Sequence, residues 1–249
     1  MNPCRRKFAI FTVVLFLSTI VQTLVAENSQ DNKTLRVFIF AGQSNMVGSD
    51  SKVKDIRRFP PFAGLEEPQS DVKFSYSIGR ENKMESNGWV DLQPVNNVVG
   101  PELSFARKVS AAIDAPIAVI KCAAGGTHLG GDWNPEQPLG FKMYPLALQL
   151  IQDSLAKLDQ QKIKYRIEGF MWHQGENDQG AAGPDGGYGW QTYQHYFIEM
   201  SAAWKRDFPN VEQYYIFQIW PNACSMGNGN GDMLREVQRT LPNLYSKMS

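Results

Sequence analysis

The stretch FIFAGQSNM, from Phe38 to Met46, decides how this sequence is read. Its first half is a short apolar run, which is typical of a strand covered on both faces. Its second half is a turn of small and polar residues that presents a serine, Ser44. Two later segments repeat this change from apolar strand to polar loop: KCAAGGTH at 121–128 and FMWHQGEND at 170–178. Together the three junctions supply a serine, glycine amides and a carboxylate, which are the groups that acyl transfer requires.

Apolar runs alternate with helical patterns along the chain, which predicts parallel βα units in one α/β domain. Strands are expected at 35–41, 117–122, 167–172 and 214–220. Three apolar stripes at helical spacing are expected to be core: Leu103, Ala106, Val109 and Ile113; Met143, Leu146, Leu150 and Ile151; Tyr193, Phe197, Met200 and Trp204. The proline-containing stretch 48–98 lacks clear periodicity, which indicates a long loop over the active edge of the sheet.

The composition suits a globular protein and excludes some functions. Of 249 residues, 43% are hydrophobic and 12% aromatic, which a disordered chain would not match. The 25 basic residues balance the 25 acidic ones. No basic stripe is present, so nucleic acid is not an expected partner. A neutral or small molecule is the expected ligand.

The first residues read as a separate targeting unit. Arg5, Arg6 and Lys7 precede the apolar run 8–20, and small or polar residues follow around Ala26. This layout predicts a signal peptide over 1–26, followed by a linker over 27–34 and one domain over 35–249. An uncleaved anchor is the alternative, although the run is shorter than the ~20 residues of a comfortable membrane span. Export to the periplasm or outside the cell follows on either reading, with no stable membrane partner after cleavage.

The mature chain keeps two cysteines, Cys122 and Cys224. An oxidising compartment allows them to form a disulfide, and two independent buried thiols are the alternative. No CxxC motif or cysteine and histidine cluster suggests a zinc site.

The candidate site begins with Ser44. A helix N-cap is a common role for a serine at such a turn. Here Gly42 lets the turn tighten, while the amides of Gln43 and Asn45 could donate to an oxyanion. These neighbours favour a nucleophile over a cap.

The glycine pair Gly125 and Gly126 either makes only a tight turn or also brings a backbone N–H to the substrate oxygen. In the third segment, Gln174 has an amide that could serve the oxyanion, and Glu176 has a carboxylate that could orient a histidine. His173, next to Gln174 in the sequence, is expected to be a hydrogen-bonded structural residue.

Several aromatic side chains follow the predicted strands, and flat rings suit the apolar faces of sugars. Trp133, Tyr188, Trp190 and Trp220 are therefore candidates for stacking, with ordinary packing under loops as the alternative. Gln43, Asn45, His128, Trp133 and Trp190 make up the set expected to bind substrate.

Four ordered motifs, GQSNM, GPE at 100–102, KCAAGGTH and WHQGEND, resemble the sialate O-acetylesterase and acetylxylan esterase branch of the SGNH hydrolases. The resemblance implies a flavodoxin-like three-layer α/β/α fold and removal of O-acetyl groups from sugars through an acetyl-serine, with no metal or organic cofactor taking part. It also implies Ser44 as nucleophile, Glu176 as the acidic triad partner, and an oxyanion hole of Ser44, Gly125 or Gly126, and Gln174.

One part of the family pattern is missing. The family carries its general base as a histidine in a D-x-H or D-x-x-H motif near the C-terminus, and this sequence has no histidine after His195. A chain lacking its C-terminal end is the first explanation, and a non-catalytic sugar-binding relative is the second. His128 is a possible replacement base because it follows the glycine pair, whereas His195 falls in a helical stripe. A lipase or thioesterase of the same superfamily is a third reading of function.

Overall fold

The structure is a computed structural model that describes residues 33–80, 83–180, 187–211, 213–221 and 230–244. The expected signal peptide over 1–26 and the second cysteine, Cys224, lie outside these residues. Cys122 is buried with a free thiol, and burial raises its pKa to about 12. Among the described helices, none has the length and apolar character needed to cross a membrane.

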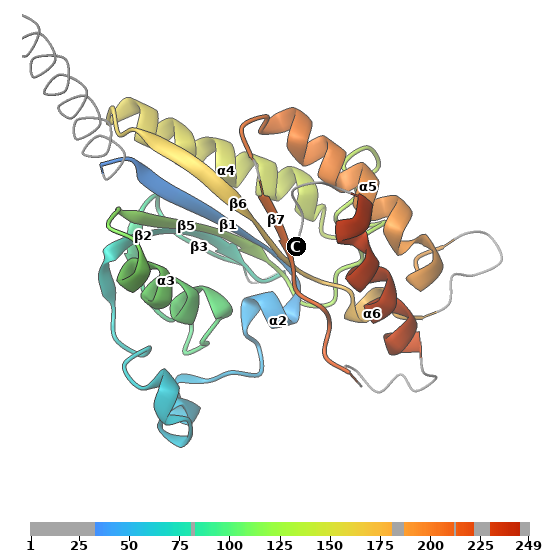
Figure 1. The fold of residues 1–249 in the computed structure, drawn as a ribbon, viewed down its shortest axis with the longest axis horizontal. Helices are drawn as coiled ribbons and strands as arrows, with labels where there is room; N and C mark the ends of the chain where they lie inside the picture. Colours follow the sequence, from blue (N-terminus) through green and yellow to red (C-terminus); the bar gives the residue numbers. More distant parts are fainter. Residues whose placement is uncertain (1–32, 81–82, 181–186, 212, 222–229, 245–249) are drawn as a thin grey trace, which may run out of the picture.

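A central sheet organises the fold, with strand order β3-β2-β5-β1-β6-β7 and β4 paired to β2 (Figure 1). Strands β2, β5, β1, β6 and β7 run parallel, whereas β3 and β4 pair with β2 in the antiparallel direction. The strands are β1 (Leu35–Gly42), β2 (Gln69–Ile78), β3 (Met84–Glu85), β4 (Val90–Leu92), β5 (Ile117–Ala123), β6 (Tyr165–His173) and β7 (Gln213–Ile216).

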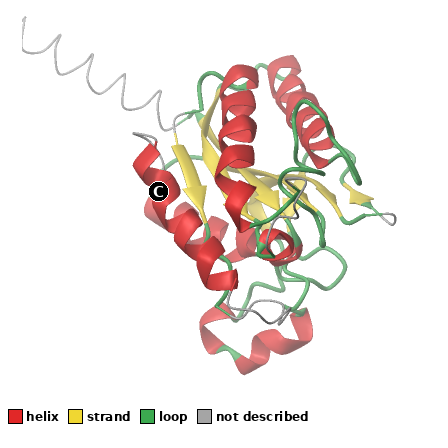
Figure 2. Ribbon diagram, turned by 90° about the vertical axis from the view of Figure 1, so that its right-hand side faces the viewer, coloured by secondary structure: helices red, strands yellow, loops and turns green. Residues whose placement is uncertain are grey.

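Helices lie on both faces of the sheet (Figures 1 and 2). A hydrophobic core lies between the helices and each face. On one face α3 (Pro101–Ala112) covers the core that contains Phe40 and Phe74. On the other, α4 (Met143–Gln160), α5 (Trp190–Asp207) and α6 (Asn230–Thr240) cover the larger core. Both faces are buried, so strands β1 and β5 have only buried residues. The expected α/β fold with a mainly parallel sheet is confirmed.

The three helical stripes in the sequence form α3, α4 and α5. All four residues of the third stripe are buried in α5. The first stripe differs at its end, because α3 stops at Ala112 and Ile113 is 39% exposed. Proline at the first position of α3 fits the rule that the first helical N–H has no helical partner to lose.

The irregular pattern of the stretch 48–98 predicted a long loop, and this prediction is wrong for much of the stretch. It contains the ten-residue strand β2 in addition to β3, β4 and short 3-10 turns at Val53–Arg58 and Pro60–Phe62. β2 carries exposed polar residues in its first half and buried residues in its second. This mixed burial hides the periodicity that reveals a central strand. The predicted strand at 214–220 is also shorter, ending at Ile216.

Gly42, the last residue of β1, sits unusually close to β6. Its φ is +153°, and a Cβ on this residue would lie 2.1 Å from the carbonyl oxygen of His173. The N–H of the next residue, Gln43, donates to that same oxygen at 3.0 Å. A glycine is therefore required where β1 turns into the segment that carries Ser44.

Candidate active site

Three loops meet at the carboxyl ends of β1, β5 and β6. Gly42 pairs with Ala123 on one side and with His173 on the other, so these strands end at the same level. Ser44 follows β1 directly, and a Cβ placed on Gly125 would lie 3.4 Å from the Cβ of Ser44. The serine and the glycine loop thus lie side by side at the edge where ligands bind in parallel α/β sheets.

Ser44 opens α2 (Ser44–Val47), a single turn of helix. The N-cap is Gln43, so the alternative in which Ser44 caps the helix is wrong. The carbonyl of Ser44 accepts the N–H groups of Gly48, at 2.9 Å, and Ser49, at 3.0 Å. Gly48 ends the helix in the left-handed conformation with φ +88°. The side chain of Ser44 is left half-buried at the start of the turn.

Glu176 holds this turn through the residues on either side of Ser44. Its carboxylate is 3% exposed, with Oε2 accepting from Nε2 of Gln43 and Oε1 from Nδ2 of Asn45. A buried carboxylate needs such partners. The side-chain amides of Gln43 and Asn45 therefore bind Glu176 here, whereas the sequence suggested that they face an oxyanion.

Gln174 is fully buried and differs from its expected role. Its Nε2 donates to the carbonyl of Thr127 at 2.9 Å and to Oδ2 of Asp178 at 2.5 Å. Both amide hydrogens are therefore used inside the protein, and none is left for a substrate oxyanion. Gln174 instead ties the loop after β6 to the loop after β5.

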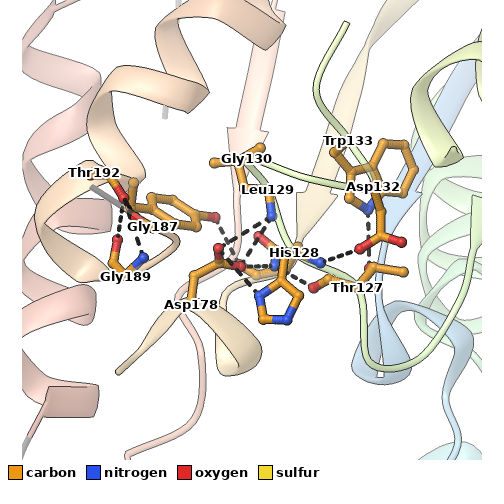
Figure 3. Close-up of polar contacts among 12 residues, drawn as sticks. Thr127, His128, Leu129, Gly130, Asp132, Trp133, Asp178, Gly187, Gly189 and Thr192 are labelled. Carbon is orange, nitrogen blue, oxygen red and sulfur yellow. Dashed lines mark hydrogen bonds and ion pairs between the residues drawn. The ribbon is translucent and has the colours of Figure 1, made fainter. Parts of the chain in front are cut away.

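Asp178 is the centre of this second connection (Figure 3). It is 1% exposed and accepts the N–H of Leu129 at 3.1 Å as well as Gln174. Its Oδ1 lies 3.8 Å from Nδ1 of His128, which is an ion-pair contact longer than a hydrogen bond. The sequence reading did not single out Asp178, although it is the last residue of WHQGEND.

His128 stands at the rim of the site with its side chain 38% exposed. Asp178 raises the pKa of His128; desolvation opposes the rise, Asp132 adds to it, and the positive charge of Arg80 opposes it. The ring of Tyr188 lies beside that of His128 with centroids 5.1 Å apart. Asp132 fixes the same loop by accepting the N–H of His128 at 2.8 Å.

Asp178→Asn is expected to lower the pKa of His128, because the raised value depends first on the Asp178 carboxylate. Since the charged imidazole is favoured in the folded wild type, its contact contributes stability below the unfolded pKa of His128. This contribution is lost as pH rises through the folded-state pKa. NMR titration of the His128 ring protons checks this, with Glu199→Gln beside the exposed His195 as the control. An unchanged His128 titration would contradict the assignment.

Gly126 turns the glycine loop with φ +72°, and its carbonyl accepts from Nη2 of Arg80 at 2.8 Å. A Cβ on Gly126 would lie 1.9 Å from that nitrogen. The Arg80 guanidinium also lies over the ring of Phe141, 4.5 Å from its centroid. Gly126 is thus the member of the pair that makes the turn, whereas Gly125 is the one against Ser44.

The other two histidines are less suited than His128 to act as a base. His173 is mostly buried, and desolvation lowers its pKa against the opposing charge of Glu176. Its ring lies 5.6 Å from that of Phe217. His195 is at the surface, where its Nε2 pairs with Glu199 at 3.2 Å.

The aromatic side chains expected to stack on a sugar differ in how much of each is exposed to solvent. Trp133 is fully buried, its Nε1 donates to Thr127 at 3.1 Å, and its ring meets Trp172 edge to face. The expectation that Trp133 binds substrate is therefore wrong for this conformation, because no face is open to a sugar. Trp190 is half-buried against the larger core, and Trp220 is 72% exposed.

Helix α6 reaches the site through Gln238, which is 1% exposed. Its Nε2 donates to the carbonyl of Gln174 at 2.8 Å, and its Oε1 accepts the N–H of Ile219 at 2.9 Å. The hydroxyl of Tyr193 donates to the same Gln174 carbonyl at 2.9 Å. Helices α5 and α6, both distant in sequence, thereby support the loop that carries Glu176.

Comparison with known proteins agrees with this architecture. A probable carbohydrate esterase of Arabidopsis thaliana is 26% identical over 216 residues, covering 82% of this chain and 74% of that protein. Its solved structure superposes with a TM-score of 0.58 at 21% identity, covering 83% of this chain and 81% of the other.

Two further solved structures share the fold. A carbohydrate acetylesterase from Xanthomonas citri aligns with a TM-score of 0.58 at 15% identity, covering 85% of this chain and 48% of that one. NanS aligns with a TM-score of 0.51 at 18% identity, covering 76% and 68%. The sequence pattern of one family extends over residues 34–241. This chain therefore belongs to the family of carbohydrate esterases described as sialic acid-specific acetylesterases.

Proposed function

We propose that this chain is an exported serine esterase that removes O-acetyl groups from carbohydrates, with O-acetylated sialic acid as the first substrate to test and acetylated xylan as the second. The observation that carries the proposal is the convergence of Ser44, Gly125 and Glu176 on one edge of the sheet. The family supplies the substrate class.

In the proposed reaction, the hydroxyl of Ser44 attacks the acetyl carbonyl carbon. The sugar oxygen leaves with a proton, and the acetyl-serine formed is hydrolysed by water to acetate. The backbone N–H groups of Ser44 and Gly125 are the proposed oxyanion donors. Within the described residues neither of them donates to another backbone carbonyl, and a Cβ on Gly125 would lie 3.4 Å from the Cβ of Ser44, so the two residues are neighbours.

In this proposal Glu176 positions the Ser44 turn and is not the acidic member of a catalytic triad. It holds Gln43 and Asn45, and so fixes the peptide that places the Ser44 hydroxyl and N–H. His128 is the proposed proton acceptor, because it is partly exposed, lies three residues beyond Gly125 and has a carboxylate beside Nδ1. If so, Asp178→Asn moves the acidic limb of the pH–rate profile to lower pH, since a base of lower pKa is neutral at lower pH.

The proposal is tested by acetate release from O-acetylated sialic acid and from acetylated xylan, together with 4-nitrophenyl esters of increasing chain length. Acetyl esters are expected to be the best of the series, and a fluorophosphonate is expected to add to the peptide that contains Ser44. Preference for long acyl chains would favour a lipase or thioesterase. Binding of acetylated sugar without acetate release or labelling would favour a non-catalytic relative.

A further inference from the structure

A buried ion pair lies directly behind the turn that carries Ser44. Lys121 on β5 and Glu102 on α3 are 1% and 3% exposed at their side chains, and Nζ lies 2.6 Å from Oε2. The same Nζ donates to the carbonyl of Val47, the last residue of α2, at 3.2 Å. The proposed reaction uses neither of these charged groups.

Two glycines make room for this arrangement. A Cβ on Gly100 would lie 2.2 Å from Oε2 of Glu102 and 2.3 Å from Nζ of Lys121. A Cβ on Gly48, the residue that ends α2, would lie 2.5 Å from the carbonyl oxygen of Val99. The segment before α3 therefore packs against the end of α2 with backbone alone, which gives the GPE stretch at 100–102 a physical reason.

Stability alone is a poor explanation for the pair. Removing two charges from water costs free energy, and apolar side chains of similar size often serve a core equally well. Burial lowers the pKa of Lys121, and the attraction of Glu102 opposes that change. What an apolar pair cannot supply is a donor to the Val47 carbonyl, one of the carbonyls that a helix leaves without a partner at its end.

We propose that Lys121, held by Glu102, is a positioning residue that fixes the C-terminal end of the Ser44 turn. Glu176 holds the other end of the turn through Gln43 and Asn45. The Ser44 segment is thereby fixed from both sides of the sheet edge. The inference rests on the proposed function only in taking Ser44 as the reacting group.

The test compares Lys121→Met with the double variant Lys121→Met/Glu102→Leu. The single variant leaves Glu102 buried without its partner and is expected to lose both thermal stability and Ser44 reactivity. The double variant removes both charges and is expected to recover most of the melting temperature, because no buried ion remains. It is not expected to restore the wild-type order of the Ser44 turn, since the donor to the Val47 carbonyl is still absent.

Two readouts report the turn itself. In the double variant, hydrogen exchange at the Gly48 and Ser49 amides should be about tenfold faster than in the wild type. Labelling of Ser44 by the fluorophosphonate should be about tenfold slower, because a small displacement of a reacting group has a large effect on rate. The control is Glu168→Gln, which removes the ion pair with Arg36 at the far end of β1, 2.8 Å in the wild type. It should change neither readout.

A double variant with wild-type exchange and wild-type labelling would overturn the proposal. If this variant does not fold, Lys121→Met/Glu102→Gln decides, because it also removes both buried charges and the donor to Val47 but keeps the shape of the Glu102 side chain. Exchange at Gly48 and Ser49 should again be about tenfold faster than in the wild type, and wild-type exchange in this folded protein would overturn the inference. Failure of the wild type to label at Ser44 would instead count against the proposed function, while hydrogen exchange would still decide on Lys121.

Discussion

Ser44→Ala is expected to lower kcat for acetyl ester hydrolysis by about 10³–10⁶-fold. The reason is that the alanine variant keeps the proposed oxyanion amides but has no oxygen to form the acetyl intermediate. The substitution removes one atom from a half-buried side chain at the start of α2, so the fold should be retained. Initial rates with 4-nitrophenyl acetate, thermal unfolding and the mass of the labelled peptide provide the measurement.

The matched control for this variant is Ser51→Ala, which changes an exposed serine of the same segment. It should leave both the rate and the labelling at the wild-type level. A folded Ser44→Ala protein that hydrolysed acetyl esters as fast as Ser51→Ala would contradict the nucleophile assignment.

Glu176→Ala is expected to have the largest effect on the site as a whole. The substitution removes both acceptors of the Gln43 and Asn45 amides and leaves these donors without partners next to Ser44. Loss of charge-assisted hydrogen bonds in a buried site should lower the free energy of unfolding by about 3–5 kcal/mol. The rate should fall at least about 10²-fold, because the turn no longer holds Ser44 in one place.

Glu176→Gln separates the two contributions of the carboxylate. The glutamine can accept from one amide, but its NH₂ group then faces the other donor, so an intermediate loss of stability is expected. Urea unfolding and fluorophosphonate labelling measure the two effects, and Glu199→Ala on the surface of α5 is the control. Wild-type labelling by a folded Glu176→Ala protein would show that Glu176 does not position Ser44.

The sequence predicted the centre of the sheet well because its strands are buried on both faces. Strands β1 and β5 each end one residue after the predicted bound, and a continuous apolar run leaves little room for another structure. β2 was missed because its polar first half, Gln69–Asp71, is half-exposed or exposed, so burial does not mark the whole strand. Hydrophobic periodicity identifies only the part of a strand that is buried, because only buried positions require apolar side chains.

The candidate site was predicted in position but not in its hydrogen bonds. The carboxyl ends of parallel strands meet, so Ser44, Gly125 and Glu176 had to share one edge. Which acceptor an amide chooses depends on distances that a sequence does not contain. Thus Gln174 binds Asp178, while Gln43 binds Glu176. Trp133 follows a strand as expected, but it is buried in the larger core, where Trp172 packs edge to face against it.

Gln238 connects helix α6 to the loop after β6 that carries Glu176. Gln238 of the helix donates a hydrogen bond to the carbonyl of Gln174, two residues before Glu176. Glu176 in turn accepts hydrogen bonds from both neighbours of Ser44. Unwinding of α6 is therefore expected to loosen the position of Ser44, which lies far away along the chain. Surface engineering of α6 should be judged by turnover as well as by melting temperature.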